Sequence, residues 1–430
     1  MRLLVSYQYK TLLTSIATIC SRFSLGATLA IIPLLVANYF GNELAKNVAL
    51  AINLSSYSSW LVLGGYATVM RDHRLAQNKI DMELINNQYK KLASLQCVGA
   101  IILTVLLASF FIIFLKPSYL NITSFILSLL LGVVVQCTSF WLNIVLGFSY
   151  AMNKFISVNF NVSILRFTSI LIFLIGINFS KSFDAILLIS SIVYIIGSIG
   201  FYLHYMTINS ALVLNNNTND KKRFMSLLKE SLIYFNWSLF STAVFLLPVS
   251  AAALIAPDLL LPITFAFFLA GANQNLVAAL ITPQANILLD GIGNLKALQE
   301  YYLYTLKTSL LVTSGMILLG FCIAYFGENF IKFSNYKDSI FLTVLFVGVS
   351  GLRSLTLATT QAAITLKMEK LVSLSPLFEA VASILGVVTC WYFSRGEWIT
   401  YVFLVAVVVR LIAVIQLEYS KININWKNNI

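Results

Sequence analysis

The sequence predicts an all-α integral membrane protein with about twelve transmembrane helices in two six-helix bundles. Hydrophobic residues make up 59% of the 430 positions and charged residues only 10%, which is far outside the range of water-soluble domains. Apolar runs of about 20 residues, the length that a helix needs to cross a bilayer, recur along the whole chain. The strands of a membrane barrel would instead be short and would alternate in hydropathy.

Twelve spans can be drawn, six before a polar central passage and six after it. They cover residues 11–40, 46–70, 92–115, 122–149, 156–177 and 185–206, then 232–256, 262–289, 306–326, 339–366, 371–393 and 398–417. The first run is too long for a secretion signal and is kept as a span. We therefore predict an N-terminal bundle at 1–206, a linker at 207–231, a C-terminal bundle at 232–417 and a tail at 418–430.

The linker is the least hydrophobic passage of the chain. Its Asn-rich residues 215–220 run into Lys221, Lys222 and Arg223. A segment of this composition cannot bury enough apolar surface to fold alone. We expect it to be solvated, with at most a short amphipathic helix from Phe224 to Leu228.

A weak internal repeat relates the two halves. Residues 152–155 (MNKF), after span four, match residues 368–371 (MEKL), after span ten. Because the match keeps the order of the spans, it indicates two bundles in the same orientation, related by an axis along the membrane normal.

The basic residues predict the orientation of the chain. Assigning alternate loops to the two sides places 18 Lys and Arg residues on the side of both termini and 6 on the other side. Because Lys and Arg collect in cytoplasmic loops, both termini and the linker are expected in the cytoplasm. The net charge of +12 thus follows from membrane topology, and we expect no nucleic-acid partner.

The sequence contains no pattern that indicates catalysis, a metal or a cofactor. It lacks paired carboxylates, a nucleophile with a neighbouring base and a phosphate-binding glycine loop, so we predict that the chain is not an enzyme. The five cysteines all lie in apolar segments and form no CxxC pair. We interpret them as small core residues, without a disulfide framework or a zinc site.

The remaining four of the 28 basic residues lie inside spans. An arginine at the centre of a span costs about 2.5 to 3.5 kcal/mol on insertion scales, so it should face a wet cavity or a partner. Three of them, Arg22, Arg166 and Arg353, lie deep in their spans, whereas Arg410 lies close enough to a span end for snorkelling and function to stay equally open. Polar residues at helical spacing share a face with the three deep arginines, as in Asn159, Ser163 and Arg166.

Two further polar features lie inside spans. Glu379 is the one acidic residue predicted deep in a span, and it either pairs with an arginine for structural reasons or is a protonatable coupling group. Asn273, Gln274 and Asn275 are consecutive, and Pro283 and Gln284 follow. These residues indicate either a broken helix that lines a central space or a polar contact between helices.

The chain resembles a known family in its twelve spans, its central linker and its intramembrane arginines. Two passages also carry the resemblance, 33–47 (PLLVANYFGNELAKN) and 63–75 (LGGYATVMRDHRL). The chain is similar to the polysaccharide flippases of the multidrug, oligosaccharidyl-lipid and polysaccharide exporter (MOP) superfamily, and most closely to the O-antigen flippase family Wzx. This resemblance implies a MATE-like fold in the bacterial inner membrane. It also implies partners: membrane lipids, and the polymerase and chain-length regulator of the same pathway.

The resemblance further implies that the chain moves undecaprenyl-pyrophosphate-linked O-antigen units from the cytoplasmic to the periplasmic leaflet. We expect Arg22, Arg166 and Arg353 to attract the pyrophosphate, because guanidinium groups bind phosphate in pairs of hydrogen bonds. Glu379 is the candidate for proton or sodium coupling. The residues expected to bind sugar are Gln136, Asn143, Asn159, Asn273 and Gln361.

Two alternatives belong to other functional classes. A MATE-type multidrug and cation antiporter would share the fold, but several arginines against a single deep acid are a poor lining for cationic drugs. An O-antigen polymerase would also be polytopic, but it would be expected to place substantial loops in the periplasm. The longest external loop predicted here covers only residues 327–338.

Overall fold

Every regular element that the structure describes is a helix. The computed structural model describes residues 31–61, 79–115, 117–151, 155–179, 182–207, 220–281, 294–326, 336–366 and 374–428, and the isolated positions 13, 16, 17, 20, 21, 288, 368 and 371. The chain forms two compact units, which are described separately. Unit 1 comprises Met1–Leu50 and Phe240–Ile430, and unit 2 comprises Ala51–Leu239.

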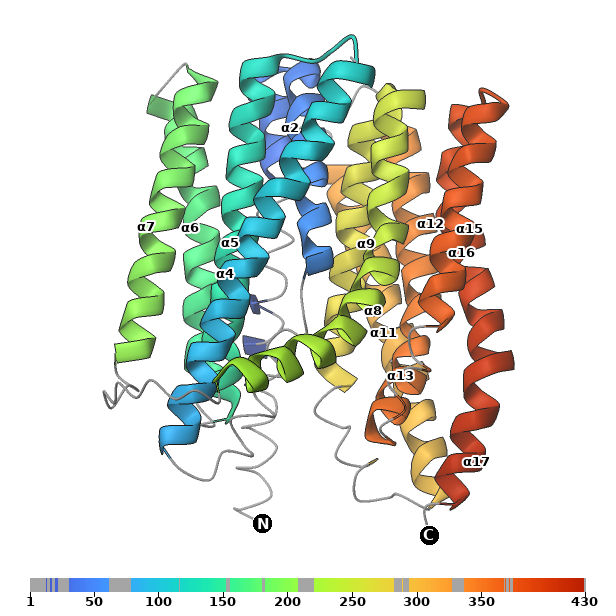
Figure 1. The fold of residues 1–430 in the computed structure, drawn as a ribbon. Coiled ribbons are helices and arrows are strands. Elements are labelled where there is room, and N and C mark those ends of the chain that lie inside the picture. Colours follow the sequence, from blue (N-terminus) through green and yellow to red (C-terminus); the bar gives the residue numbers. More distant parts are fainter. Residues whose placement is uncertain are drawn as a thin grey trace. The chain divides into compact units, whose positions relative to one another are not determined.

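Unit 2 is built from four long helices. In chain order they are α4 (Lys79–Phe110), α5 (Ile122–Ala151), α6 (Phe155–Phe179) and α7 (Phe183–Thr207). Helix α5 packs against each of the other three, and α6 also packs against α7 (Figure 1). A short 3₁₀ helix, η1 (Tyr57–Leu61), follows α2 (Asn42–Ser56) and packs on α4, where the Gln96 side chain donates a hydrogen bond to the Leu61 carbonyl.

Unit 1 contains the second part of α8 and a set of helices that follow it. They are α8 (Asp220–Ile255), α9 (Leu260–Ile281), α11 (Leu295–Phe326), α12 (Tyr336–Ser354), α13 (Thr356–Thr365), α15 (Leu374–Tyr392), α16 (Ile399–Ala413) and α17 (Ser420–Asn428). Helix α12 lies at the centre, because it packs against α9, α11 and α16. Helix α15 packs mainly on α16.

The described residues contain nine helices that are long and apolar enough to cross a membrane. They correspond to the predicted spans three to six and eight to twelve. Shorter apolar helices at Ile31–Phe40 and Leu239–Ile255 fall within the predicted spans one and seven. The predicted all-α membrane architecture is therefore confirmed.

Two predicted boundaries differ from the structure. Helix α8 begins at Asp220, inside the segment expected to be a solvated linker. The reason is apolar packing, because Phe224, Leu227 and Leu228 join a core cluster with Ile85 and Tyr89 of α4. The predicted amphipathic helix at 224–228 thus lies within a much longer helix.

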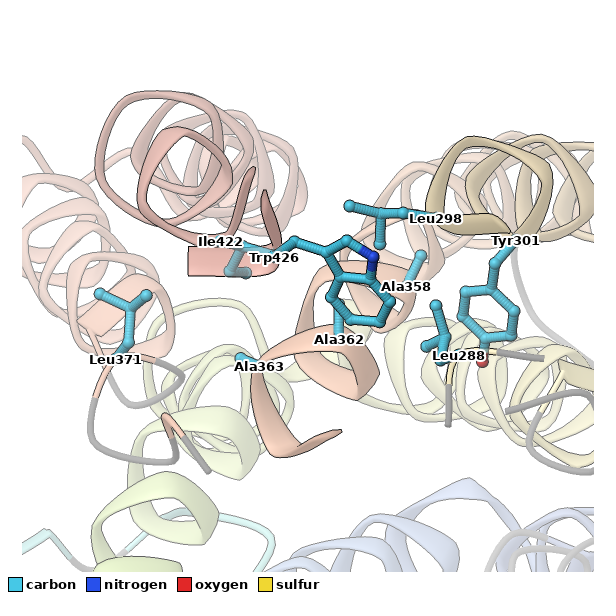
Figure 2. Close-up of a cluster of buried hydrophobic side chains, with 9 residues drawn as sticks. All are labelled: Leu288, Leu298, Tyr301, Ala358, Ala362, Ala363, Leu371, Ile422 and Trp426. Atoms are coloured by element: carbon cyan, nitrogen blue, oxygen red, sulfur yellow. The ribbon is translucent and has the colours of Figure 1, made fainter. Parts of the chain in front are cut away.

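The segment expected to be a tail is also helical. It forms a π-helical turn, η7 (Val414–Tyr419), and then α17. Figure 2 shows the Trp426 ring inside a cluster that includes Leu298, Tyr301 and Ala362. Trp426 is fully buried, and its indole N–H donates a hydrogen bond to the Asn294 carbonyl at 3.2 Å. The end of the chain therefore belongs to the core of unit 1.

Predicted span ten is interrupted. Helix α12 ends at Ser354 and α13 begins at Thr356, with Leu355 in a turn between them. The Thr356 hydroxyl donates to the Arg353 carbonyl at 2.8 Å, and the Ser354 hydroxyl donates to the Ser350 carbonyl at 2.8 Å. Such bonds from side-chain hydroxyls to the helix backbone commonly accompany bends. The interruption places Arg353 two residues before an irregular backbone.

Candidate functional site

The core of unit 1 contains an ion pair between Arg353 of α12 and Glu379 of α15. The Arg353 Nε atom lies 2.6 Å from one carboxylate oxygen, and its Nη2 atom lies 3.1 Å from the other. Glu379 is fully buried and Arg353 is only 5% exposed. The two side chains thus meet in the two-bond geometry that makes guanidinium–carboxylate pairs strong. Glu379 thus pairs with an arginine, and its role as a coupling group stays a prediction.

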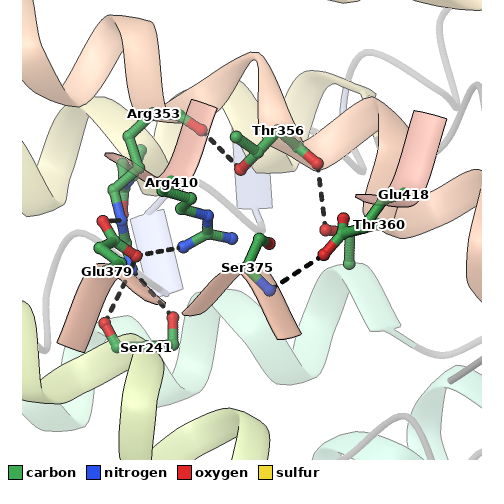
Figure 3. A network of polar contacts seen from close by, with 9 residues as sticks. Ser241, Arg353, Thr356, Thr360, Ser375, Glu379, Arg410 and Glu418 are labelled. Atoms are coloured by element: carbon green, nitrogen blue, oxygen red, sulfur yellow. Dashed lines mark hydrogen bonds and ion pairs between the residues drawn. The ribbon is translucent and has the colours of Figure 1, made fainter. Parts of the chain in front are cut away.

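A second arginine shares the same carboxylate. The Nη1 atom of Arg410, on α16, lies 2.6 Å from the second oxygen of Glu379 (Figure 3). Arg410 is 3% exposed, and its Nε atom is buried without a hydrogen-bond partner among the described residues. Snorkelling does not account for Arg410, because its charged group points into the protein and pairs with Glu379.

The other donors of Arg353 are also engaged. Its Nη1 atom donates to the Gln274 amide oxygen at 2.8 Å, and its Nη2 atom donates to the Ser241 carbonyl at 2.8 Å. The guanidinium lies 4.7 Å from the ring centre of Phe245, close enough for a cation–π interaction. Residues from α8, α9, α12 and α15 therefore converge on one guanidinium.

A second buried acid supports the cluster from the far end of α16. Glu418 in η7 is 1% exposed, and its carboxylate accepts a hydrogen bond from the Ser375 backbone N–H at 3.1 Å. That N–H lies in the first turn of α15, where backbone donors lack partners within the helix and favour a negative charge. Glu418 thus fixes the start of α15, one turn before Glu379.

The shared carboxylate leaves the cluster with a surplus positive charge. The Arg353–Glu379–Arg410 cluster holds two guanidinium groups against one carboxylate, so these three side chains carry a formal charge of +1. Glu418 lies within electrostatic range of Arg410 and offsets part of this charge. A buried surplus charge is strongly unfavourable unless other groups compensate it. Gln274, Ser241 and Phe245 supply part of this compensation to Arg353. The arrangement can therefore attract an anion, with Arg410 as the less occupied of the two guanidinium groups.

The other polar residues expected in unit 1 have different surroundings. Asn273 is fully buried, and its amide donates to the hydroxyls of Ser350 at 2.8 Å and Thr313 at 3.1 Å. It thus links α9 to α11 and α12. Asn275 is half-buried, and α9 continues as a helix through Ile281. These three consecutive residues therefore fan around an intact helix. Pro283 and Gln284 lie outside the described residues.

The expected residues of the N-terminal half lie in unit 2 as far as they are described. Gln136 on α5 is buried, and so are Asn159 and Arg166 on α6, whereas Asn143 on α5 is half-buried. Arg22 lies outside the described residues. In unit 1, Gln361 on α13 is half-buried. The structure thus brings Arg353 and Glu379 together in one site within unit 1.

Sequence reasoning missed three participants of this site. Gln274 was noticed only as part of a polar triplet, and Arg410 was left between two interpretations. Glu418 was assigned to the tail, although it follows Arg410 by eight residues, which is about two helical turns. That spacing on an apolar helix was the available signal.

Comparisons with known proteins identify the fold of the chain. No protein-family model matches the sequence, and no curated protein sequence matches it. Solved structures do match over nearly the whole chain. An inward-facing multidrug resistance MATE family transporter of the MOP superfamily gives a TM-score of 0.60 at 13% identity, covering 98% of this chain and 96% of that chain.

Two further structures show the same relationship. A eukaryotic MATE transporter gives a TM-score of 0.60 at 14% identity and covers 99% of each chain. The lipid II flippase MurJ, in an inward closed conformation, gives a TM-score of 0.58 at 16% identity, covering 97% of this chain and 90% of that chain. The chain is thus an all-helical, multi-pass membrane protein with a MATE-like fold.

Proposed function

We propose that the chain is a transporter of anionic, lipid-linked oligosaccharides. More specifically, we propose that it moves undecaprenyl-pyrophosphate-linked O-antigen units from the cytoplasmic to the periplasmic leaflet of the bacterial inner membrane. The observation that carries this proposal is the surplus positive charge of the buried Arg353–Glu379–Arg410 cluster. An anionic cargo is the chemical complement of such a cluster, and a pyrophosphate presents several oxygens to guanidinium groups.

Cargo binding at this cluster would be an exchange of anions. Glu379 occupies the two-bond face of Arg353, and it also holds Arg410. An incoming phosphate would first contact Arg410, whose N–H donors are only partly occupied by Glu379. Two phosphate oxygens can then replace the carboxylate on one arginine while Glu379 stays on the other. The cluster would thus keep its charges paired in both states.

The fold supports a lipid-linked cargo. One solved neighbour is a lipid II flippase, and this likeness supports the proposal of a lipid-linked cargo. The lipid tail of the cargo can stay in the bilayer, so only the polar head group needs polar partners. Our candidates for those further contacts remain Arg22, Arg166, Gln136, Asn143, Asn159, Asn273 and Gln361.

The proposed direction agrees with the charge of the cargo. We propose that both termini lie in the cytoplasm, on the side that carries 18 of the 24 loop Lys and Arg residues. Moving an anion outward is favoured by an inside-negative potential, by about 2.3 kcal/mol per charge per 100 mV. Glu379 remains our candidate for coupling transport to protons or sodium.

The deciding experiment is a gene deletion in the native host, followed by a lipopolysaccharide gel and extraction of lipid-linked oligosaccharides. We expect the whole O-antigen ladder to be lost and lipid-linked repeat units to accumulate facing the cytoplasm. Complementation with Arg353→Ala or Arg410→Ala should fail to restore the ladder at equal protein level. Asn275→Ala, a half-buried position on the neighbouring helix α9, is the matched control and should restore it.

Other outcomes would assign a different function. A single repeat unit without longer rungs would indicate a polymerase. An intact ladder with new sensitivity to cationic drugs would indicate a drug exporter, the activity named for the MATE neighbours. The surplus positive charge of the cluster disfavours that second candidate, because it would repel a cationic drug.

A further inference from the structure

Helix α7 carries a row of buried hydroxyl groups that the proposed transport function does not use. Ser190, Tyr194, Ser198 and Tyr202 follow one another at intervals of four residues, which places them on one face of the helix. Ser190, Tyr194 and Ser198 are 0%, 1% and 5% exposed. The hydroxyl oxygens of Ser190, Ser198 and Tyr202 have no hydrogen-bond partner among the described residues, and the Tyr194 hydroxyl lies near the Arg166 guanidinium. We call these four residues the hydroxyl ladder.

The ladder differs from the other hydroxyls of the same bundle. Ser191, its neighbour on α7, donates to the Leu187 carbonyl at 2.9 Å, and Ser163 on α6 donates to the Asn159 carbonyl at 2.7 Å. Serine in a helix can always make such a bond by turning its side chain back on the helix. Ser190 and Ser198 do not make it, so their hydroxyls have no partner on their own helix.

The ladder faces protein rather than lipid. The residues on the other side of α7 are apolar and exposed, as expected for a lipid-facing surface, and include Ile192, Ile196 and Ile199 at 46%, 64% and 54%. The buried side of α7 packs against α5 and α6. The row of hydroxyls therefore lies in the interior of unit 2, where an unpartnered polar group is costly.

The spacing of the ladder matches the size of water. Four residues of an α-helix rise about 6 Å. Serine hydroxyls lie close to the helix backbone and tyrosine hydroxyls farther from it, so one or more water molecules, each making hydrogen bonds of about 2.8 Å, would bridge neighbouring hydroxyls. A single file of water along α7 would thus satisfy each hydroxyl and join all four in one hydrogen-bonded chain.

A buried charge lies beside the middle of the ladder. Arg166 on α6 is 5% exposed, and its guanidinium is close enough to the Tyr194 side chain to interact with it electrostatically. Arginine inside a membrane is stabilised chiefly by water that reaches it. Water held at Tyr194 would solvate this guanidinium.

We propose that the hydroxyl ladder binds a file of ordered water inside unit 2 and that this water solvates Arg166. The ligand of this site is water itself. The guanidinium at the middle of the file repels hydronium and other cations, so the file holds water without conducting protons. The inference does not depend on which cargo the protein carries.

Radiolytic hydroxyl-radical labelling of the purified, unmodified protein tests the proposal directly. Radicals generated from bound water label the side chains next to it, including buried tyrosines. Tyr301 is the internal control, because it is also fully buried but donates its hydroxyl to the Ile281 carbonyl at 3.3 Å. We expect Tyr194 to be labelled several-fold faster than Tyr301. Equal, background-level labelling of both would overturn the proposal.

A double-mutant cycle provides a second, independent test. In a hydrated ladder, Ser198→Ala removes a water ligand and should lower the melting temperature of the protein. The loss should be smaller in an Arg166→Met background, because the water then has no charge to solvate. Ser191→Ala is the matched control and should show no such coupling. A rise in melting temperature with Ser198→Ala, equal in both backgrounds, would mean that the hydroxyls are dry.

Discussion

At the scale of single residues, the site of unit 1 depends on one carboxylate that two guanidinium groups share. Glu379 contributes both of its oxygens, one at 2.6 Å from Arg353 and the other at 2.6 Å from Arg410. Without it, two buried positive charges would face each other. The carboxylate therefore has a structural role whether or not it takes part in transport.

This role predicts the effect of neutralising Glu379. Glu379→Gln should destabilise the protein by about 3 to 5 kcal/mol, the usual loss when one partner of a buried ion pair is removed. Unfolding in detergent, followed by circular dichroism, measures it. The double variant Glu379→Gln, Arg410→Gln restores the charge to that of one arginine and should recover part of the loss. No recovery would contradict the explanation by charge.

Asn273 links three helices, and its role in sugar binding stays a prediction. Its amide joins α9 to α11 and α12 through hydroxyl groups. Asn273→Ala should remove both of these buried hydrogen bonds and cost about 1 to 3 kcal/mol. The same unfolding measurement applies, and Asn275→Ala, two positions along the same helix, should cost clearly less. Equal losses would show that the amide bonds contribute little.

Some residues of this site can be predicted from the sequence and others cannot. Arg353 and Glu379 were identifiable because a charge in an apolar span needs a partner. Their pairing could not be predicted, because it depends on how α12 and α15 pack. Glu418 was missed because its span was ended too early, and only the structure shows that the helix continues as η7 and α17.

At the scale of helices, α11 and α12 approach each other closely at Gly351. A side-chain carbon at this position would overlap the Thr313 side chain, whereas one at Gly348 would meet nothing within 4 Å. The Ser309 hydroxyl also donates to the Gly351 carbonyl at 2.8 Å. Gly351 thus allows α11 and α12 to come close enough for this hydrogen bond, two residues before Arg353 in the chain.

Gly351→Ala should therefore destabilise the protein by about 1 to 3 kcal/mol, because Thr313 is β-branched and stiff. Gly348→Ala lies one turn earlier on α12 and should be neutral or stabilising. Thermal unfolding of both variants in the same detergent measures the difference. If the two variants behave alike, the close contact at Gly351 does not limit the packing.

The start of α15 depends on Glu418 of another helix. Glu418→Ala should release the Ser375 amide, with a loss of about 1 kcal/mol that corresponds to roughly fivefold faster hydrogen exchange. Mass spectrometry of a peptide that covers residues 374–380 measures this exchange. Glu418→Gln keeps an oxygen acceptor and should exchange nearly as the parent does. Unchanged exchange in Glu418→Ala would show that the cap is not needed.

The sequence predicts helices better than it predicts their irregularities. Apolar length identified each of the nine long helices, because bilayer thickness fixes that length. The interruption at Leu355 and the π-helical turn at Val414–Tyr419 were not predicted. They depend on local hydroxyl bonds and on packing, which hydropathy does not record.

At the scale of the whole molecule, the distribution of basic residues predicts topology. A green fluorescent protein fused after Ile430 should fluoresce, because it folds in the cytoplasm, and alkaline phosphatase at the same place should be inactive. The opposite result is expected for insertions at Ser394, in the exposed turn after α15. An active phosphatase at the C-terminus would reverse the proposed orientation.

The order in which the cluster is synthesised has a consequence for biogenesis. Arg353 leaves the ribosome 26 residues before Glu379, and Arg410 follows Glu379 by 31 residues. Helix α12 therefore has to enter the bilayer, or wait in the insertion machinery, with a guanidinium that has no acid to neutralise it. A nascent chain that stops before α15 would expose this charge to quality-control proteases. The last three membrane helices are thus expected to be inserted as a group, after translation has passed Glu379.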